Sequence, residues 1–155
     1  MMLALALLLQ AAPLPAGEEP VEPYAMSNAN TGATPIRDPA MWRAFHGKEG
    51  VGRVVDGMVS RVQRDPRISD IFKGHDLVRL RRVLREHFCH VLGGGCDYTG
   101  RTMRDAHKDM GVQQADMGAL VENLQASMRA EGVPFAAQNR FLAKLAPMRR
   151  EVVQR

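Results

Sequence analysis

The stretch that decides the fold is residues 93–107, which read GGGCDYTGRTMRDAH. Three consecutive glycines end a helix here, because glycine readily adopts the left-handed conformation of helix ends. A short loop follows, and Thr102 starts a second, short helix. His107 shares a helical stripe with Met103 and Met110, so its imidazole faces the apolar side of that helix. We therefore expect this helix to present one imidazole to a buried metal or cofactor; a core histidine with one hydrogen bond is the alternative.

The composition is typical of a helical protein. Only 5% of the 155 residues are aromatic, while Met (10 residues), Ala, Leu and Val are plentiful. A β-sandwich would need more β-branched and aromatic residues. The roughly 115 residues after position 40 are enough for one domain with its own core. The net charge of +4 is spread along the expected helices, so we expect a solvated surface and no nucleic-acid partner.

Apolar residues at helical spacing, together with cap and stop signals, predict an all-α fold with no strand. Asp-Pro pairs at positions 38–39 and 65–66 mark helix starts. Pro147 should kink or end the last helix. The helices that these signals predict cover about residues 39–46, 49–64, 68–72, 77–92, 102–108, 113–131 and 134–146.

The first 37 residues differ from the rest of the chain. Residues 1–16 form an apolar run of signal-peptide length, too short to span a bilayer, although no Lys or Arg precedes it. We expect export to the periplasm or medium and no stable membrane insertion after signal removal; a cytoplasmic chain with an apolar tail is the alternative. Residues 17–37 have the Pro-rich, polar composition of a flexible linker. The remaining residues, 38–155, form the domain.

The two cysteines, Cys89 and Cys96, flank the glycine turn. In an exported chain we expect a disulfide across this turn, whereas in a cytosolic chain we expect two free thiols, one of them in the core. The CxxC spacing of zinc and iron–sulfur sites is absent. Both pairing states therefore stay open.

Residues 41–153 resemble a truncated haemoglobin of the first group. The specific part is the run YTGRTMRDAH at positions 98–107, and the DPRI corner at 65–68 and the glycine pair at 93–94 support it. The resemblance implies a shortened globin fold, a two-over-two helical sandwich around haem b (iron protoporphyrin IX). It makes His107 the protein's single iron ligand, so that the opposite position is open for a diatomic gas such as O2, CO or NO.

The same resemblance implies which side chains surround the haem. Phe72 matches the aromatic residue that packs on the haem face. The implied cofactor-binding residues are Phe72, Leu80, Leu84, Phe88, Met103 and His107. The matching distal residues, on the gas side, are Met58, Val59, Leu80, Val83 and Leu84.

All the distal residues are apolar, where the family often carries a tyrosine, glutamine or histidine. A hydrogen-bond donor near bound oxygen stabilises it by roughly 1.5–3 kcal/mol, because the bound oxygen carries partial negative charge. Without that donor we expect fast oxygen release and relatively better binding of CO or NO. His87 or a rotated Tyr98 would be the substitute donors, although we expect His87 to lie at the edge of a solvated face.

Several cationic residues are candidates for pairing with the haem propionates, because arginine offers a planar fork to carboxylates. These candidates are His75, Arg79, Arg82, Arg101 and Arg104. The remaining histidines, His46 and His90, are expected at the surface or at helix caps.

The leading functional hypothesis is therefore a haem protein that binds a diatomic gas. Oxygen transport, nitric-oxide oxidation with an electron-donor reductase, sensing and weak peroxidase chemistry all stay open, and so does whether the protein is an enzyme. The first alternative is a haem-based electron-transfer or haem-holding protein with incidental gas binding, which two axial ligands would favour. The second is a cofactor-free helical interaction domain.

Overall fold

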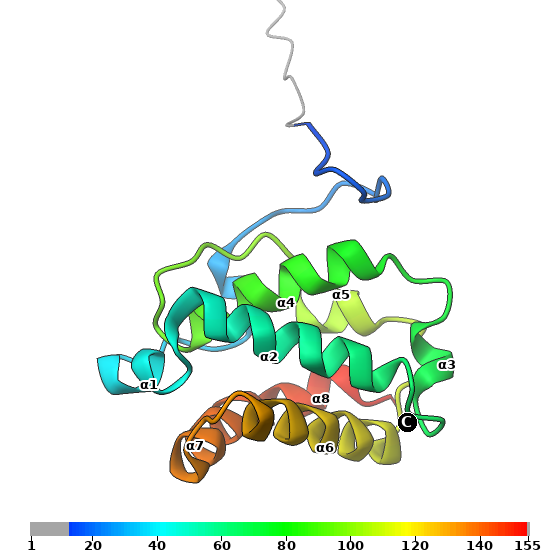
Figure 1. Ribbon diagram of the computed structural model, residues 1–155. Coiled ribbons are helices and arrows are strands. Elements are labelled where there is room, and N and C mark those ends of the chain that lie inside the picture. The colour runs from blue at the N-terminus through cyan, green and yellow to red at the C-terminus, as the bar shows by residue number, and fades with distance from the viewer. Residues whose placement is uncertain (1–12, 155) are drawn as a thin grey trace, which may run out of the picture.

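The structure, a computed structural model, describes residues 13–154 and is all-helical over that range (Figure 1). Each helix predicted from the sequence is present, and the prediction of an all-α fold is confirmed. The helices are α1 (Pro39–Ala44), α2 (Gly47–Val62), α3 (Ser69–Phe72), α4 (Leu77–Val91), α5 (Met103–His107), α6 (Gln114–Ala130), α7 (Phe135–Leu145) and α8 (Arg149–Val152). Two 3-10 turns, η1 (Asn28–Thr31) and η2 (Ala146–Met148), complete the set.

Local signals place the helix ends. The carboxylate of Asp38 accepts a hydrogen bond from the Ala40 amide at 2.9 Å, and that of Asp76 caps α4 in the same way. Pro147 lies in η2, where the chain tightens into a 3-10 turn directly after α7. These contacts join residues two or three positions apart, so the sequence alone was enough to predict them.

The core forms where α2 lies between α4 and α6 (Figure 1). The buried face of α2 is rich in valine and packs against both neighbours. At the crossing with α6, the Ser127 hydroxyl donates a hydrogen bond to the Val54 carbonyl at 2.6 Å. A Cβ atom on Gly57 would lie 2.4 Å from the same hydroxyl oxygen, so a larger residue at this position would push the two helices apart.

Three phenylalanines from different parts of the chain pack together in the core. The Phe141 ring lies edge-on to Phe45 and to Phe88, with centroids 5.2 and 4.9 Å apart. Each such pair contributes about 0.5–1.5 kcal/mol beyond the area that it buries. The core thereby joins α1, α4 and α7, and α5 packs separately against α8.

Residues 17–34, named here the strap, lie against the domain, which differs from the flexible linker expected for residues 17–37. Thr31 is fully buried, and its hydroxyl bonds to the carbonyls of Asn28 and Ala33. In Figure 1 the strap is the blue segment that runs beside α4. A polar, proline-rich composition predicts disorder only when its polar groups find no partners. Here the domain supplies some of them, because Asn28 Nδ2 donates to the Asp97 carboxylate at 3.1 Å and the Thr31 carbonyl lies 2.9 Å from His87 Nε2.

Most of the signal-like segment at residues 1–16 lies outside the described residues, which begin at residue 13. Within residues 13–154, none of the helices combines the length and apolar character needed to cross a bilayer.

Candidate functional site

His107 lies at the end of α5, a helix of five residues that Thr102 caps by accepting a hydrogen bond from the Asp105 amide at 3.1 Å. The His107 ring is fixed by its Nδ1 atom, which lies 2.7 Å from the Met103 carbonyl oxygen. Because a carbonyl can only accept, Nδ1 carries the proton and Nε2 keeps its lone pair. Within the described residues, no hydrogen bond reaches Nε2.

Burial favours the uncharged form of this imidazole. The pKa of His107 lies below its ordinary value because burial disfavours the cation, and the Met103 hydrogen bond opposes that shift only in part. The ring is therefore neutral at pH 7, which is the form that binds a metal. Its tautomer, orientation and charge all suit a metal ligand that acts through Nε2.

Apolar side chains that are only partly buried line the helices around α5. Leu80 and Leu84 on α4, Phe72 on α3 and Met103 on α5 pack against the edge of the core without being enclosed by it. Val83 on α4 is likewise half-buried. These side chains keep apolar area available for contact with a further apolar group.

Three residues of the implied site lie deeper. Met58 and Val59 are enclosed in the core on α2, and Phe88 packs against Phe141 with 4% of its surface exposed. These three side chains belong to the core itself, so any contact with a cofactor would add to contacts that they already make with the core.

His87 is buried, with 5% of its surface exposed, and the expectation that it lies at a solvated edge was wrong. Its Nε2 atom lies 2.9 Å from the Thr31 carbonyl oxygen in the strap, and burial lowers its pKa. Burial likewise raises the pKa of Tyr98 to about 12, and its hydroxyl donates to the Arg101 carbonyl at 2.9 Å. Both side chains that might have offered a polar contact to a gas are thus bonded to the backbone.

The candidate partners for haem propionates separate into two sets. Arg79, Arg82 and Arg101 all contact the strap. Arg104 instead lies with Lys108 beside a shallow surface hollow. His75 is exposed in the turn before α4. Sequence reasoning missed the strap as a binding partner, because its contacts join residues more than 55 positions apart.

Cys89 and Cys96 form a disulfide with Cα atoms 5.7 Å apart, a pairing that the sequence left open. The bond ties the end of α4 to the loop that leads into α5. A Cβ atom on Gly94 would lie 2.7 Å from the Cys89 sulfur and 2.5 Å from the Trp42 ring. The glycine turn is therefore needed for close packing around the disulfide.

Replacing both cysteines with alanine should lower the free energy of unfolding by about 2.5 kcal/mol, the closure entropy of a loop of about eight residues. Urea unfolding of the wild type and the double variant, each with and without a thiol reductant, measures this difference. Reductant should lower the wild-type midpoint and leave that of the variant unchanged. A wild-type midpoint insensitive to reductant would show that the disulfide contributes nothing.

The fold is a small helical domain in which α5 presents the neutral His107 imidazole, and comparison with known proteins identifies the family. A family model described as bacterial-like globin matches residues 40–154. The group 1 truncated haemoglobin of Mycolicibacterium paratuberculosis is 31% identical over 106 residues, which are 68% of this chain and 78% of that protein. That of Synechocystis is 31% identical over 98 residues, 61% of this chain and 79% of that one.

A solved structure agrees with these relatives. The truncated haemoglobin of Tetrahymena pyriformis in its Fe(III) form matches with a TM-score of 0.71 at 25% identity, covering 74% of this chain and 98% of that one. The chain belongs to the bacterial-like globin family and, within it, to the group 1 truncated haemoglobins. The predicted shortened globin fold is confirmed, and membership of the family implies that the chain binds haem.

Proposed function

We propose that this protein holds haem b between α4 and α5, with His107 as the single protein ligand to the iron, and binds a diatomic gas on the opposite side. The carrying observation is the 2.7 Å contact between His107 Nδ1 and the Met103 carbonyl, which leaves Nε2 as a free, neutral donor atom. The half-buried apolar side chains around α5 fit a large apolar ring. When bound, haem supplies an iron with one open coordination position.

The chain's own residues would perform three tasks at this site. The Met103 carbonyl holds the His107 proton on Nδ1 and increases the basicity of Nε2. The partly buried side chains of Phe72, Leu80 and Leu84 would exclude water from the bound ring. Since His87 and Tyr98 are bonded to backbone carbonyls, a gas such as O2, CO or NO would meet an apolar surface. Binding of this kind needs no electron donor, whereas nitric-oxide oxidation would need a reductase.

Absorption and resonance Raman spectra of the purified, reduced protein test this proposal. We expect a Soret band and five-coordinate, high-spin ferrous iron, because His87 and Tyr98 are both bonded to backbone carbonyls and so are not available as a second iron ligand. Six-coordinate, low-spin iron without added ligand would instead favour the electron-transfer or haem-holding alternative. A protein that gives no Soret band after incubation with haem would refute the proposal.

Two features support export of this protein to the periplasm or medium. Residues 1–16 have the length and apolar character of a signal peptide. The Cys89–Cys96 disulfide suits an oxidising compartment, since disulfides are rare where cytosolic thiols keep cysteines reduced. Fractionation of the native host, with the mature N-terminus read by mass spectrometry, tests the assignment; a full-length protein in the cytosol would contradict it.

A further inference from the structure

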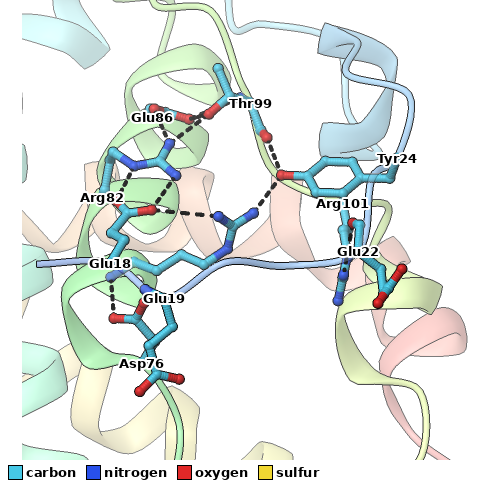
Figure 2. Close-up of polar contacts among 10 residues, drawn as sticks. Glu18, Glu19, Glu22, Tyr24, Asp76, Arg82, Glu86, Thr99 and Arg101 are labelled. Carbon is cyan, nitrogen blue, oxygen red and sulfur yellow. Dashed lines mark hydrogen bonds and ion pairs between the residues drawn. The ribbon is translucent and has the colours of Figure 1, made fainter. Parts of the chain in front are cut away.

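A carboxylate of the strap is buried against two arginines of α4. The Glu18 side chain is 1% exposed and pairs with Arg82, whose Nε and Nη2 atoms both donate to it, the second at 2.9 Å. Arg79 Nη1 reaches the same carboxylate at 3.4 Å. Figure 2 shows the Glu18 carboxylate beside the Arg82 guanidinium, at the end of the strap that is far from η1 in sequence.

The same arginines continue the network to the loop that leads into α5 (Figure 2). Arg82 Nη1 donates to the Glu86 carboxylate at 2.9 Å and to the Thr99 hydroxyl at 2.6 Å. Arg79 Nη2 donates to the Tyr24 hydroxyl at 2.5 Å, and that hydroxyl donates to the Thr99 carbonyl at 2.6 Å. The strap, α4 and the loop at residues 97–100 are thus joined by one set of charge-assisted hydrogen bonds.

Further along, the strap reaches both helices that flank the haem site. Its Thr31 carbonyl lies 2.9 Å from His87 Nε2 on α4. A Cβ atom on Gly32 would lie 3.8 Å from Met103 Cγ, at the start of the helix that carries His107. The strap therefore spans the edge between α4, which carries Leu80 and Leu84, and α5, which carries the proposed iron ligand His107.

The network pairs arginines with carboxylates, and Asp76 adds a further carboxylate that accepts from the Glu19 amide at 2.7 Å. Two guanidinium groups, Arg79 and Arg82, face two carboxylates, Glu18 and Glu86. Glu18 has a lowered pKa, mainly because Arg82 donates to it, so the carboxylate stays ionised at neutral pH. A buried carboxylate without its cation is strongly disfavoured, so these arginines stay with Glu18 as long as the strap is in place.

We propose that residues 17–34 form a latched strap over one edge of the haem site, and that Glu18 is the positioning residue whose ion pairs with Arg79 and Arg82 set the rate at which haem enters and leaves. This inference rests on the proposed haem site between α4 and α5. Haem can pass that edge only when the strap moves, and moving it separates Glu18 from both arginines. Arg79 and Arg82 would then bind the strap, and other cationic residues would pair with the haem propionates.

Transfer of haem from the ferric protein to an excess of apomyoglobin tests the latch. Glu18→Gln keeps the shape of the side chain and removes its charge, so haem loss should speed up about tenfold. Two controls remove one negative charge elsewhere. Glu19→Gln changes the exposed neighbour in the strap. Glu131→Gln breaks the contacts of a largely buried carboxylate with the half-exposed Arg53 and His46, where α2 meets the end of α6.

Both controls should lose haem at the wild-type rate. If Glu131→Gln accelerates loss as much as Glu18→Gln, the effect follows general stability and the latch is refuted. An unchanged rate in Glu18→Gln overturns the proposal, and a slower rate would mean that Glu18 competes with the propionates for the arginines.

Hydrogen exchange supplies a readout that does not depend on haem loss. In Glu18→Gln the strap amides that bond within the strap or to α4, such as those of Glu19, Asn30 and Gly32, should exchange faster. Amides of α2 and α6 should keep their protection. Strap amides unchanged by the variant would refute the latch. A wild-type protein without a Soret band would instead refute the haem site itself, which is a distinct result.

Discussion

His107→Ala should abolish the five-coordinate ferrous spectrum and weaken haem binding on the order of 100-fold or more. The imidazole offers an uncharged nitrogen lone pair at Nε2, since Nδ1 is already bonded to the Met103 carbonyl. Alanine keeps the helix, because it is the best helix former, and removes only the ligand. Titration of the apoprotein with haem, followed at the Soret band, measures the loss.

Rescue by free imidazole separates loss of the ligand from loss of the fold. Imidazole added to His107→Ala should enter the space that the ring leaves and restore a histidine-like ferrous spectrum. His46→Ala is the matched control, because His46 precedes α2 and pairs with Glu131. It should bind haem like the wild type. If His107→Ala keeps the wild-type spectrum, His107 does not bind the iron.

The helices were predictable because their signals are local, whereas the assignment of His107 as iron ligand comes from the family resemblance and stays a prediction. The capping residue Thr102 bonds to the Asp105 amide, three positions later in the chain. The His107 ring bonds to the Met103 carbonyl, four positions earlier. Such contacts are fixed by helix geometry, whatever the rest of the chain does. The run at residues 93–107 thus contains both the glycine turn and the proposed iron ligand in one continuous stretch.

The role of each residue along α4 was harder to predict. Leu80, Leu84 and Phe88 follow one another at steps of four and form one apolar stripe. In the structure the first two are half-buried, while Phe88 lies in the core against Phe141. A stripe shows which side of a helix is buried, but what lies opposite each turn is decided by helices distant in sequence.

The strap could not be predicted from composition for the same reason. Glu18 and Tyr24 bond to residues 55 to 75 positions later in the chain. No periodic pattern of apolar residues in the sequence predicts contacts over such a separation. His87 looked like a surface residue because its partner, the Thr31 carbonyl, belongs to that segment. The disulfide also depended on the fold, which brings the two Cα atoms within bonding range.

Leu84→Gln should slow oxygen dissociation roughly tenfold to hundredfold, because the amide places a hydrogen-bond donor on an apolar wall. Leu84 is half-buried on α4, one turn from Leu80, and the two substitute donors considered from the sequence, His87 and Tyr98, are bonded to backbone carbonyls. A charge-assisted hydrogen bond contributes about 1.5–3 kcal/mol, and each 1.4 kcal/mol is a factor of ten in rate.

The comparison with carbon monoxide makes this experiment specific. Bound CO carries less negative charge than bound O2, so Leu84→Gln should change CO dissociation much less and shift the partition toward oxygen. Leu84→Met is the matched control, because it conserves volume without adding a donor, and it should leave both rates near those of the wild type. Stopped-flow displacement of each gas gives the rates. If wild-type oxygen release is already slow and Leu84→Gln leaves it unchanged, a donor other than His87 or Tyr98 reaches the gas, and the apolar distal wall inferred from Leu80, Val83 and Leu84 is wrong.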